Sequence, residues 1–262
     1  MVSATHPPGA ARRPHRRTLF PPSGSSRRAL PMASASWRGD SRTLAPMRPQ
    51  SVDTRQPRFR TRHVALVREF LSIPECGEII RAMDQAPKEP AQVVRAGESI
   101  LDESLRFCSD HHLPEELQRS VGERMTSYFD DHRAEFDSDA DYLYGPYFMS
   151  YEKGSYFRAH RDVANHRDDP PRLAAHRWSL LLYLNGRDPA GPLPAFDGGA
   201  LTLYETDPGL PDRRVVIVPE PGTLVLFRAF LMHEVATVLD GTRYAVAGWM
   251  SRAGSSPLGG AR

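Results

Sequence analysis

The chain has little lysine, little cysteine and no long apolar run, and these shortages limit the classes of protein to which it can belong. Only Lys88 and Lys153 are lysines among 34 basic residues, which we attribute to codon usage and not to mechanism. The cysteines, Cys76 and Cys108, lack a CxxC or other metal-binding spacing, so we expect reduced thiols and a cytoplasmic protein. No apolar stretch reaches the roughly 18–20 residues that a bilayer span requires, so we expect no membrane contact.

Strong charge of either sign is also missing. The formal net charge is +2, which gives no electrostatic reason to expect a nucleic-acid partner. Residues 1–58 are rich in Arg, Pro, Ser and Ala, and their only acidic residues are Asp40 and Asp53. Such a segment buries too little apolar surface to offset its ordering entropy, so we expect a disordered tail. A targeting segment, or a true start at Met32 or Met47, fits the same composition.

Residues 59–140 predict a helical segment that supports the remainder of the domain. After a short strand, Ser72 and Glu75 match a capping box at the start of a helix that ends near Asp84. Pro114 precedes a second run of apolar residues at helical spacing, so it predicts the start of a second helix.

From residue 141 the pattern changes to short strands separated by Gly, Pro and Asp. We expect strands near residues 142–151, 155–162, 177–185, 199–205, 213–218, 223–227, 233–238 and 242–250. Eight short strands at this spacing favour a sandwich or barrel of the jelly-roll type. The predicted fold is therefore mainly β with flanking helices, in a single domain over 59–254 that is followed by a flexible tail over 255–262.

A His-x-Asp pair, His160 and Asp162, closes the second of these strands. Residues two apart on a strand share a face, so an imidazole and a carboxylate can be directed to one point. A third ligand would complete the 2-His-1-carboxylate set typical of non-haem Fe(II) oxygenases. The pair alone is weak evidence, because it also arises by chance and a lone histidine is usually a satisfied core or surface residue.

His233 and Arg243 supply the missing parts of such a site. His233 opens the seventh predicted strand, and Arg243 follows ten residues later across a turn, so adjacent antiparallel strands would bring both side chains to one pocket. Fe(II) with three protein ligands keeps positions open for a bidentate 2-oxo acid and O2. The far carboxylate of that acid suits the fork of an arginine, and Tyr151 and Tyr183 could each donate a hydroxyl to it.

Other histidines compete with this assignment: His111, His112, His132, His166 and His176. They lie in polar or helical stretches without a same-face partner at the right spacing, so we expect substitution of His166 or His176 to be nearly silent. Arg161 should face away from the pair that flanks it. Trp249 shares the strand face of Arg243, so it either lines the pocket or packs in the core.

Several blocks of residues occur in a fixed order over about 110 residues, which makes them far more specific than any single motif. These blocks are Tyr151, Gly154, His160 and Asp162; Tyr183-Leu184-Asn185; Gly198-Gly199; Pro219, Gly222 and Phe227; His233 and Val235; and Gly241, Arg243 and Trp249. Through them, residues 142–251 resemble the catalytic domain of 2-oxoglutarate- and Fe(II)-dependent dioxygenases of the prolyl 4-hydroxylase type.

The resemblance implies a double-stranded β-helix (jelly-roll) core and an enzyme that couples conversion of 2-oxoglutarate to succinate and CO2 to oxidation of a C–H bond. The implied site residues are His160, Asp162 and His233 for Fe(II), Arg243 for 2-oxoglutarate, and Tyr151 or Tyr183 as a further hydrogen-bond donor. It also implies O2 as a reactant and ascorbate as a supporting reductant. Many collagen-type members bind the far carboxylate with lysine, so an arginine is closer to the oxygen-sensing and bacterial members.

Two other functions stay open on the sequence. One is a jelly-roll sensing module that keeps the metal site without catalysis, and the other is a cupin-like metal enzyme that does not use 2-oxoglutarate. The substrate is also open: a prolyl residue, another protein side chain or a free small molecule. The Pro/Gly-rich segment 187–199 predicts a loop for substrate recognition, with a plain surface excursion as the alternative.

Overall fold

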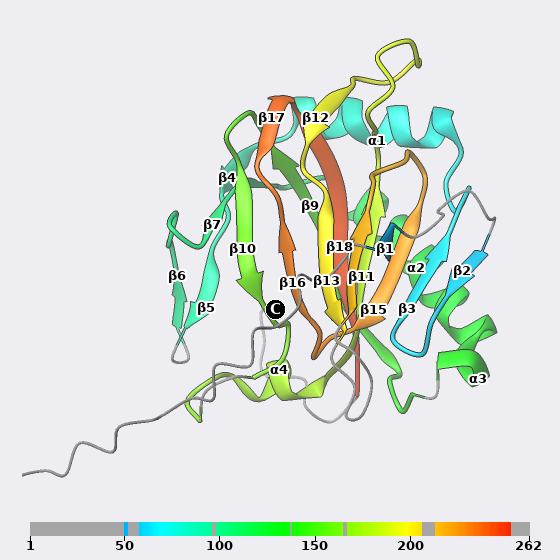
Figure 1. The fold of residues 1–262 in the computed structure, drawn as a ribbon, viewed down its shortest axis with the longest axis vertical. Coiled ribbons are helices and arrows are strands. Elements are labelled where there is room, and N and C mark those ends of the chain that lie inside the picture. The colour runs from blue at the N-terminus through cyan, green and yellow to red at the C-terminus, as the bar shows by residue number, and fades with distance from the viewer. Residues whose placement is uncertain are drawn as a thin grey trace, which may run out of the picture. The chain divides into compact units, whose positions relative to one another are not determined.

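Two facing β-sheets form the body of the protein (Figure 1). The computed structural model describes residues 50–51, 58–95, 98–136, 138–164, 167–205 and 213–252. All of them fall in one unit, Leu44–Arg262. The predicted tails lie outside the described residues, except for Gln50–Ser51 and Arg58, which belong to strands.

The larger sheet has eight strands, and every neighbouring pair in it is antiparallel. In order across the sheet these are β2 (Arg58–Arg60), β3 (Val64–Val67), β15 (Leu224–Arg228), β11 (His176–Tyr183), β18 (Arg243–Ser251), β9 (Tyr142–Tyr151), β8 (Ser109–His111) and β4 (Lys88–Pro90). The longest strands, β9, β11 and β18, lie side by side, and the candidate site lies against them.

The smaller sheet has six strands and is antiparallel except where β1 joins β14. Its order is β1 (Gln50–Ser51), β14 (Arg213–Ile217), β13 (Leu201–Glu205), β16 (Met232–Val235), β10 (Tyr156–His160) and β7 (Arg106–Phe107). Two further pairs are β12 (Phe196–Gly198) with β17 (Val238–Gly241), and β5 (Val93–Arg95) with β6 (Glu98–Ile100). This arrangement confirms the predicted jelly-roll fold.

Helices cover the outer face of the larger sheet. They are α1 (Ile73–Gln85), α2 (Glu115–Asp131) and the short α3 (Arg133–Phe136), while α4 (Pro171–Ala175) precedes β11. Cys76 on α1 is a buried free thiol, as is Cys108 between β7 and β8. In the part of the chain that is described, no helix is long and apolar enough to cross a bilayer.

Most of the predicted helices and strands are present, but several begin or end at residues other than those predicted. The predicted strand over 155–162 ends at His160, so Asp162 lies beyond it. The predicted strand over 233–238 is divided into β16 and β17, and β12 was missed. The segment expected to be helical also contains short strands, because its polar residues 88–111 add β4 and β8 to the larger sheet and β7 to the smaller one.

The start of α1 shows the predicted capping box. The Glu75 N–H donates to Ser72 Oγ over 3.4 Å, and the Ser72 N–H donates to Glu75 Oε2 over 2.7 Å. The hydrogen bonds from Ser72, and then the pairing with Arg124, lower the pKa of Glu75 from 4.5 to about 2. The ionised carboxylate therefore favours the folded state.

We predict that Glu75→Gln lowers the free energy of unfolding at pH 7 by about 0.5 kcal/mol, a small value because the exposed pair is screened by solvent. Since the folded pKa lies below the ordinary value, this stabilisation is present above pH 4.5 and is lost as the pH falls towards 2. Denaturant unfolding of both proteins at several pH values measures it. A difference that stays constant down to pH 2.5 would contradict the prediction.

Candidate metal and co-substrate site

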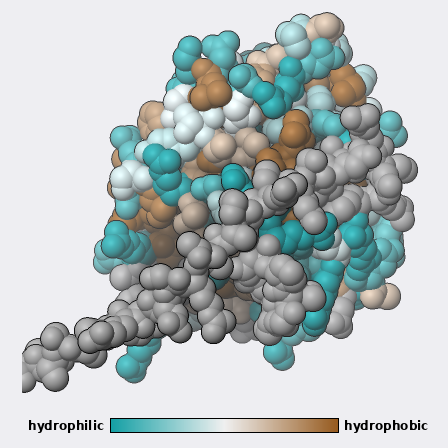
Figure 2. Space-filling view, viewed as in Figure 1, coloured by the Kyte–Doolittle hydropathy of each residue, from teal (hydrophilic) through white to brown (hydrophobic). Residues whose placement is uncertain are grey.

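A mostly apolar cavity lies between the two sheets and carries a cluster of polar groups on its wall. His160, Asp162 and His233 line it together, and Arg106 of β7 and Phe157 of β10 line it on the side of the smaller sheet. Over β7 and β10, Figure 2 shows hydrophobic residues gathered around a hollow in the surface. The cavity thus combines an apolar wall with one compact set of metal-ligating groups.

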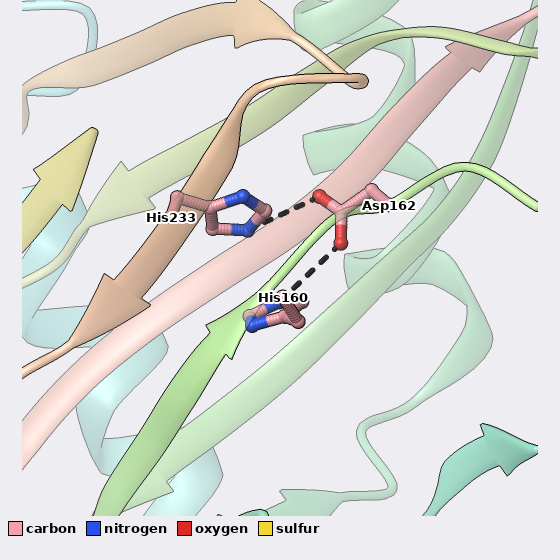
Figure 3. A group of neighbouring side chains, drawn as sticks. All are labelled: His160, Asp162 and His233. Carbon is pink, nitrogen blue, oxygen red and sulfur yellow. Dashed lines mark ion pairs between the residues drawn. The ribbon is translucent and has the colours of Figure 1, made fainter. Parts of the chain in front are cut away.

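The structure brings the three predicted ligands together (Figure 3). Nε2 of His160 lies 3.5 Å from Asp162 Oδ1, and Nε2 of His233 lies 3.5 Å from Asp162 Oδ2. The three ligand atoms all lie within 4.8 Å of one another. Neighbouring ligands of an octahedral metal are about 3 Å apart for bonds of about 2.1 Å, so a metal ion fits with a small contraction.

Backbone carbonyls fix both imidazole rings. His160 Nδ1–H donates to the carbonyl of Arg158 over 2.7 Å, and His233 Nδ1–H donates to that of Leu231 over 2.9 Å. In a neutral ring a protonated Nδ1 leaves Nε2 with a free lone pair. Both rings therefore present the nitrogen that faces Asp162 as a metal ligand, in the orientation that such outer hydrogen bonds impose in metal sites.

The protonation states also suit a metal. Burial lowers the pKa of His233 to about 4, so this ring is neutral at pH 7. Burial alone would raise the pKa of Asp162, but His233, His160 and the Ser179 hydroxyl outweigh it and hold that pKa below its usual range. A neutral imidazole and an ionised carboxylate are the forms that bind metal without first losing a proton.

Asp162 is held by hydrogen bonds and not by a strand, which corrects the reason given for the His-x-Asp pair. Its N–H donates to the carbonyl of Ala229 over 3.0 Å. Its carbonyl accepts from His176 Nδ1–H over 2.7 Å, and its Oδ2 accepts from the Ser179 hydroxyl over 2.6 Å. Backbone and side chain are thus oriented although β10 ends two residues earlier.

Of the competing histidines, His176 is the one that the structure places differently from the prediction. It is buried and contacts Asp162, so the expectation that it has no partner near the site was wrong. His111 bonds Met83 and Ser150 on the helix side, and His112 and His132 lie outside the cavity. His166 lies outside the described residues.

Arg243 lies on the larger sheet, whereas His233 lies on the smaller one, and of the three predicted co-substrate residues Tyr151 lines the cavity while Arg243 and Tyr183 lie behind that lining. The predicted adjacency of the Arg243 strand to that of His233 was wrong, because β16 pairs with β10 and β13, whereas β18 pairs with β9 and β11. Arg243 lies opposite Tyr151 on β9, and its guanidinium carbon is 4.7 Å from the Tyr151 ring and 5.1 Å from the Tyr183 ring. Both predicted tyrosines therefore flank it.

The Arg243 end of the site holds buried polar atoms without partners. Arg243 is 0% exposed, and among the described residues its Nε, Nη1 and Nη2 and the Tyr183 hydroxyl have no hydrogen-bond partner. Burial also raises the pKa of Tyr183, so its hydroxyl keeps its proton. A buried unpaired guanidinium is strongly unfavourable, and a carboxylate would pair it in fork geometry. The donors present thus fit the far carboxylate of a 2-oxo acid.

Asn185 and Gly199, which both belong to the ordered sequence motifs, position Arg243. The Asn185 amide donates to the carbonyl of Thr242 over 2.7 Å and accepts from the Tyr244 N–H over 2.8 Å, so it clamps the backbone on both sides of Arg243. A Cβ at Gly199 would lie 2.9 Å from Arg243 Cδ, and the φ of Gly199 is +58°. Glycine is therefore required at this position, by space and by conformation.

The segment 187–199 does not line the cavity, although all of it is described. It follows the end of β11 that is remote from His176. Asn185 also donates to the carbonyl of Pro194 over 2.8 Å, and Leu193 packs against the core beneath the helices. These contacts favour the alternative of a surface excursion over the predicted recognition loop, and they hold the segment against the Arg243 end.

The structural positions of three further residues can be compared with what the sequence suggested: Trp249, Arg161 and Ser179. Trp249 lines the cavity and stacks on His176, so the pocket alternative was right. Arg161 is exposed and donates to the carbonyl of Phe230, as expected for a residue that faces away. Ser179 was missed, although a lone hydroxyl within the apolar run of β11 was a usable signal. Arg106 was also missed, because a two-residue strand has no periodicity to read.

We predict that Arg243→Met raises the free energy of unfolding of the ligand-free protein by about 1 kcal/mol, because it replaces an unpaired buried cation by an apolar chain of similar length. Denaturant unfolding without metal or 2-oxo acid measures it. Arg68→Met is the matched control, since Arg68 pairs with Glu220 and its loss should destabilise. Equal destabilisation by both substitutions would show that Arg243 has partners in the free protein.

The sequence of the core matches one family model. Residues 146–251 match the model described as the 2OG-Fe(II) oxygenase superfamily, where 2OG is 2-oxoglutarate. No curated protein matches the chain in sequence. The matched segment contains all three residues of the metal-ligating cluster, and also Arg243.

Solved structures share the fold at low sequence identity. A prolyl-4-hydroxylase from Pseudomonas putida is 22% identical over 72% of this chain and 94% of its own, with a TM-score of 0.53. A prolyl hydroxylase from Trichoplax adhaerens, in complex with a peptide fragment of the hypoxia inducible factor oxygen degradation domain, is 18% identical over 77% and 89%, with a TM-score of 0.58. An oxidoreductase of the 2OG-Fe(II) oxygenase family from Burkholderia pseudomallei is 22% identical over 72% and 85%, with a TM-score of 0.50. Residues 146–251 thus match the 2OG-Fe(II) oxygenase superfamily, and the chain shares its fold with solved prolyl hydroxylases.

Proposed function

We propose that the chain is a hydroxylase in which His160, Asp162 and His233 bind Fe(II) and Arg243 binds 2-oxoglutarate. The observation that carries the proposal is the pairing of a complete metal-ligating cluster with a buried guanidinium that has no partner of its own. Neither feature alone selects this chemistry, but an acid that chelates the metal at one end and carries a second carboxylate at the other satisfies both.

The protein residues orient the reactants. The three ligands leave three positions of an octahedral metal for the 2-oxo acid and O2. Fe(II), when bound, supplies the O2-dependent oxidation of a C–H bond, with conversion of 2-oxoglutarate to succinate and CO2. Ser179 donates to Asp162 Oδ2, which favours binding of the metal through Oδ1. We expect ascorbate to sustain turnover by keeping the iron reduced.

The two candidate tyrosines have different roles in this proposal. The Tyr183 hydroxyl is buried beside Arg243 and has no acceptor among the described residues, so it is the better donor to the far carboxylate. Tyr151 lies against the guanidinium through its ring, and its hydroxyl has the Cys108 thiol as a neighbour. Tyr151 therefore supports the charge of Arg243 through a cation–π contact and forms part of the wall.

For the primary substrate, we propose a prolyl or other peptidyl C–H group first and a small apolar molecule second. The wall near the metal cluster includes Phe157, Trp249 and Leu181, which suits an apolar ring or chain. The Trichoplax adhaerens neighbour, solved with a peptide, supports the peptidyl class. Succinate release in the presence of proline-containing peptides and of small molecules, followed by mass spectrometry for one added oxygen atom, tests the class.

We predict that His160→Ala, Asp162→Ala and His233→Ala each abolish succinate formation, because each removes one of three ligands. Anaerobic titration with Fe(II) should show the loss directly. His132→Ala is the control, since His132 is the half-buried residue that follows α2, stacks on Tyr128 and does not line the cavity. A triad variant that keeps wild-type iron affinity, or a control that loses it, would contradict the ligand assignment.

We predict that Arg243→Ala weakens 2-oxoglutarate binding by about two to four powers of ten, which corresponds to about 3–5 kcal/mol for an unpaired carboxylate. Arg243→Lys should be intermediate, since it keeps the charge and loses the fork. The charge-transfer band of the anaerobic Fe(II) protein with the 2-oxo acid reports binding.

Pyruvate supplies the internal control for this experiment, because it lacks the far carboxylate. It should bind the wild type and Arg243→Ala about equally. If the variant folds, holds iron and binds 2-oxoglutarate as tightly as the wild type, the co-substrate assignment is wrong and a cupin-like metal enzyme becomes the better interpretation.

A further inference from the structure

His176 contacts the metal-ligand candidate Asp162 from outside the ligand set. Its Nδ1 lies 2.7 Å from the Asp162 backbone carbonyl oxygen, and the ring is buried. A carbonyl oxygen only accepts hydrogen bonds, so the proton resides on Nδ1 and the ring acts as a donor. This bond is directed at the backbone of a ligand and not at the metal position.

A β-bulge at the start of β11 brings His176 to this position. His176 pairs with Ser251 and Trp178 pairs with Met250, so the register with β18 shifts by one residue between them. In a regular strand His176 and Ser179, three residues apart, would point to opposite faces. Because of the bulge both reach Asp162, one at its backbone carbonyl and the other at its carboxylate.

Asp162 depends on such contacts because it lies beyond the end of β10. Within the described residues, the Asp162 backbone makes two hydrogen bonds, one from its N–H to the Ala229 carbonyl and one from His176 to its own carbonyl. Without the imidazole, the peptide that follows Asp162 loses the bond that fixes its direction. The carboxylate direction depends on the same backbone.

The His176 ring is itself held by aromatic neighbours. It stacks on Trp249 with ring centroids 5.3 Å apart and planes at 9°, and Tyr144 lies 5.7 Å away. Trp249 lines the cavity, so one ring connects the ligand residue to the cavity wall. The stacking on Trp249 and the hydrogen bond to Asp162 are separate contacts of the His176 ring, so a substitution can remove one of them and keep the other.

We propose that His176 is a positioning residue, whose Nδ1–H fixes the Asp162 backbone and thereby sets the affinity and geometry of the metal site. This inference rests on the proposed function only in taking Asp162 as a metal ligand. It differs from the prediction made from the sequence, which held substitution of His176 to be nearly silent.

The test compares His176→Phe with His176→Asn in the full chain. Phenylalanine keeps a ring against Trp249 and removes the donor, whereas the asparagine amide restores a donor near the position of Nδ1 and removes the ring. The probe is Co(II), titrated anaerobically, with its visible d–d spectrum and its dissociation constant as readouts, alongside thermal unfolding of the metal-free protein.

We expect His176→Phe to weaken Co(II) binding about 10- to 100-fold and to change the d–d bands, as loss of an outer-shell partner does in metal sites. His176→Asn should recover most of the affinity although it loses the stacking. His176→Met, with a flexible apolar chain and no donor, replaces the phenylalanine variant if that protein does not fold.

His111→Phe is the matched control for a buried histidine. His111 makes two hydrogen bonds, to Met83 and Ser150, on the helix side of the larger sheet. Its substitution should lower the unfolding temperature and leave Co(II) affinity and spectrum unchanged. The comparison separates loss of a buried hydrogen bond in general from loss of this one.

Wild-type affinity and spectrum in His176→Phe would overturn the proposal, as would equal losses in the phenylalanine and asparagine variants. The proposed function fails in a distinguishable way. In that case the wild-type protein binds Co(II) no better than His160→Ala, whatever residue occupies position 176.

Discussion

Burial of the larger sheet on both faces is the constraint on which the site depends. Along β11, Leu180 and Leu182 pack in the cluster under the helices, while Ser179 and Leu181 line the cavity and Tyr183 lies in the cluster between the sheets. A slip of one residue would exchange the two sets and place the hydroxyls under the helices. The apolar positions on the helix side therefore secure the register that presents Ser179 to the metal cluster and Tyr183 to Arg243.

The two ends of the site are then fixed by side chains that bond to backbone. Asn185 bonds the residues before and after Arg243, and it also bonds Pro194, so the segment 187–199 is tied to the strand that carries the cation. His176 acts similarly on Asp162 at the other end of β11. His176 opens β11 and Asn185 follows its last residue by two positions, so the two ends of β11 support the proposed metal and co-substrate ends.

The sequence predicted the strands, the capped helix and the ligand set, since these depend on local periodicity and on ordered motifs. It did not predict how the parts meet. Asp162 was assigned to the strand of His160, but it is held by hydrogen bonds beyond it, and Arg243 lies on the other sheet from His233. His176 was misjudged because it was placed outside the predicted strand over 177–185, whereas it opens β11 at a β-bulge, which leaves no clear pattern in one sequence. Strand pairing and bulges are long-range features, whereas periodicity is local.

The structure treats its two buried charges in opposite ways. Asp162 accepts from the Ser179 hydroxyl, and its backbone is held by Ala229 and His176, so its direction is fixed before a metal binds. Arg243 has only the faces of two tyrosine rings, and its N–H groups have no acceptor among the described residues. A carboxylate held in this way keeps its direction in the free protein, whereas an unpaired guanidinium makes the free protein less stable and the complex with a carboxylate correspondingly more favourable. In the proposed function, the metal end is thus preorganised, and the free energy of pairing Arg243 is left for the co-substrate to supply.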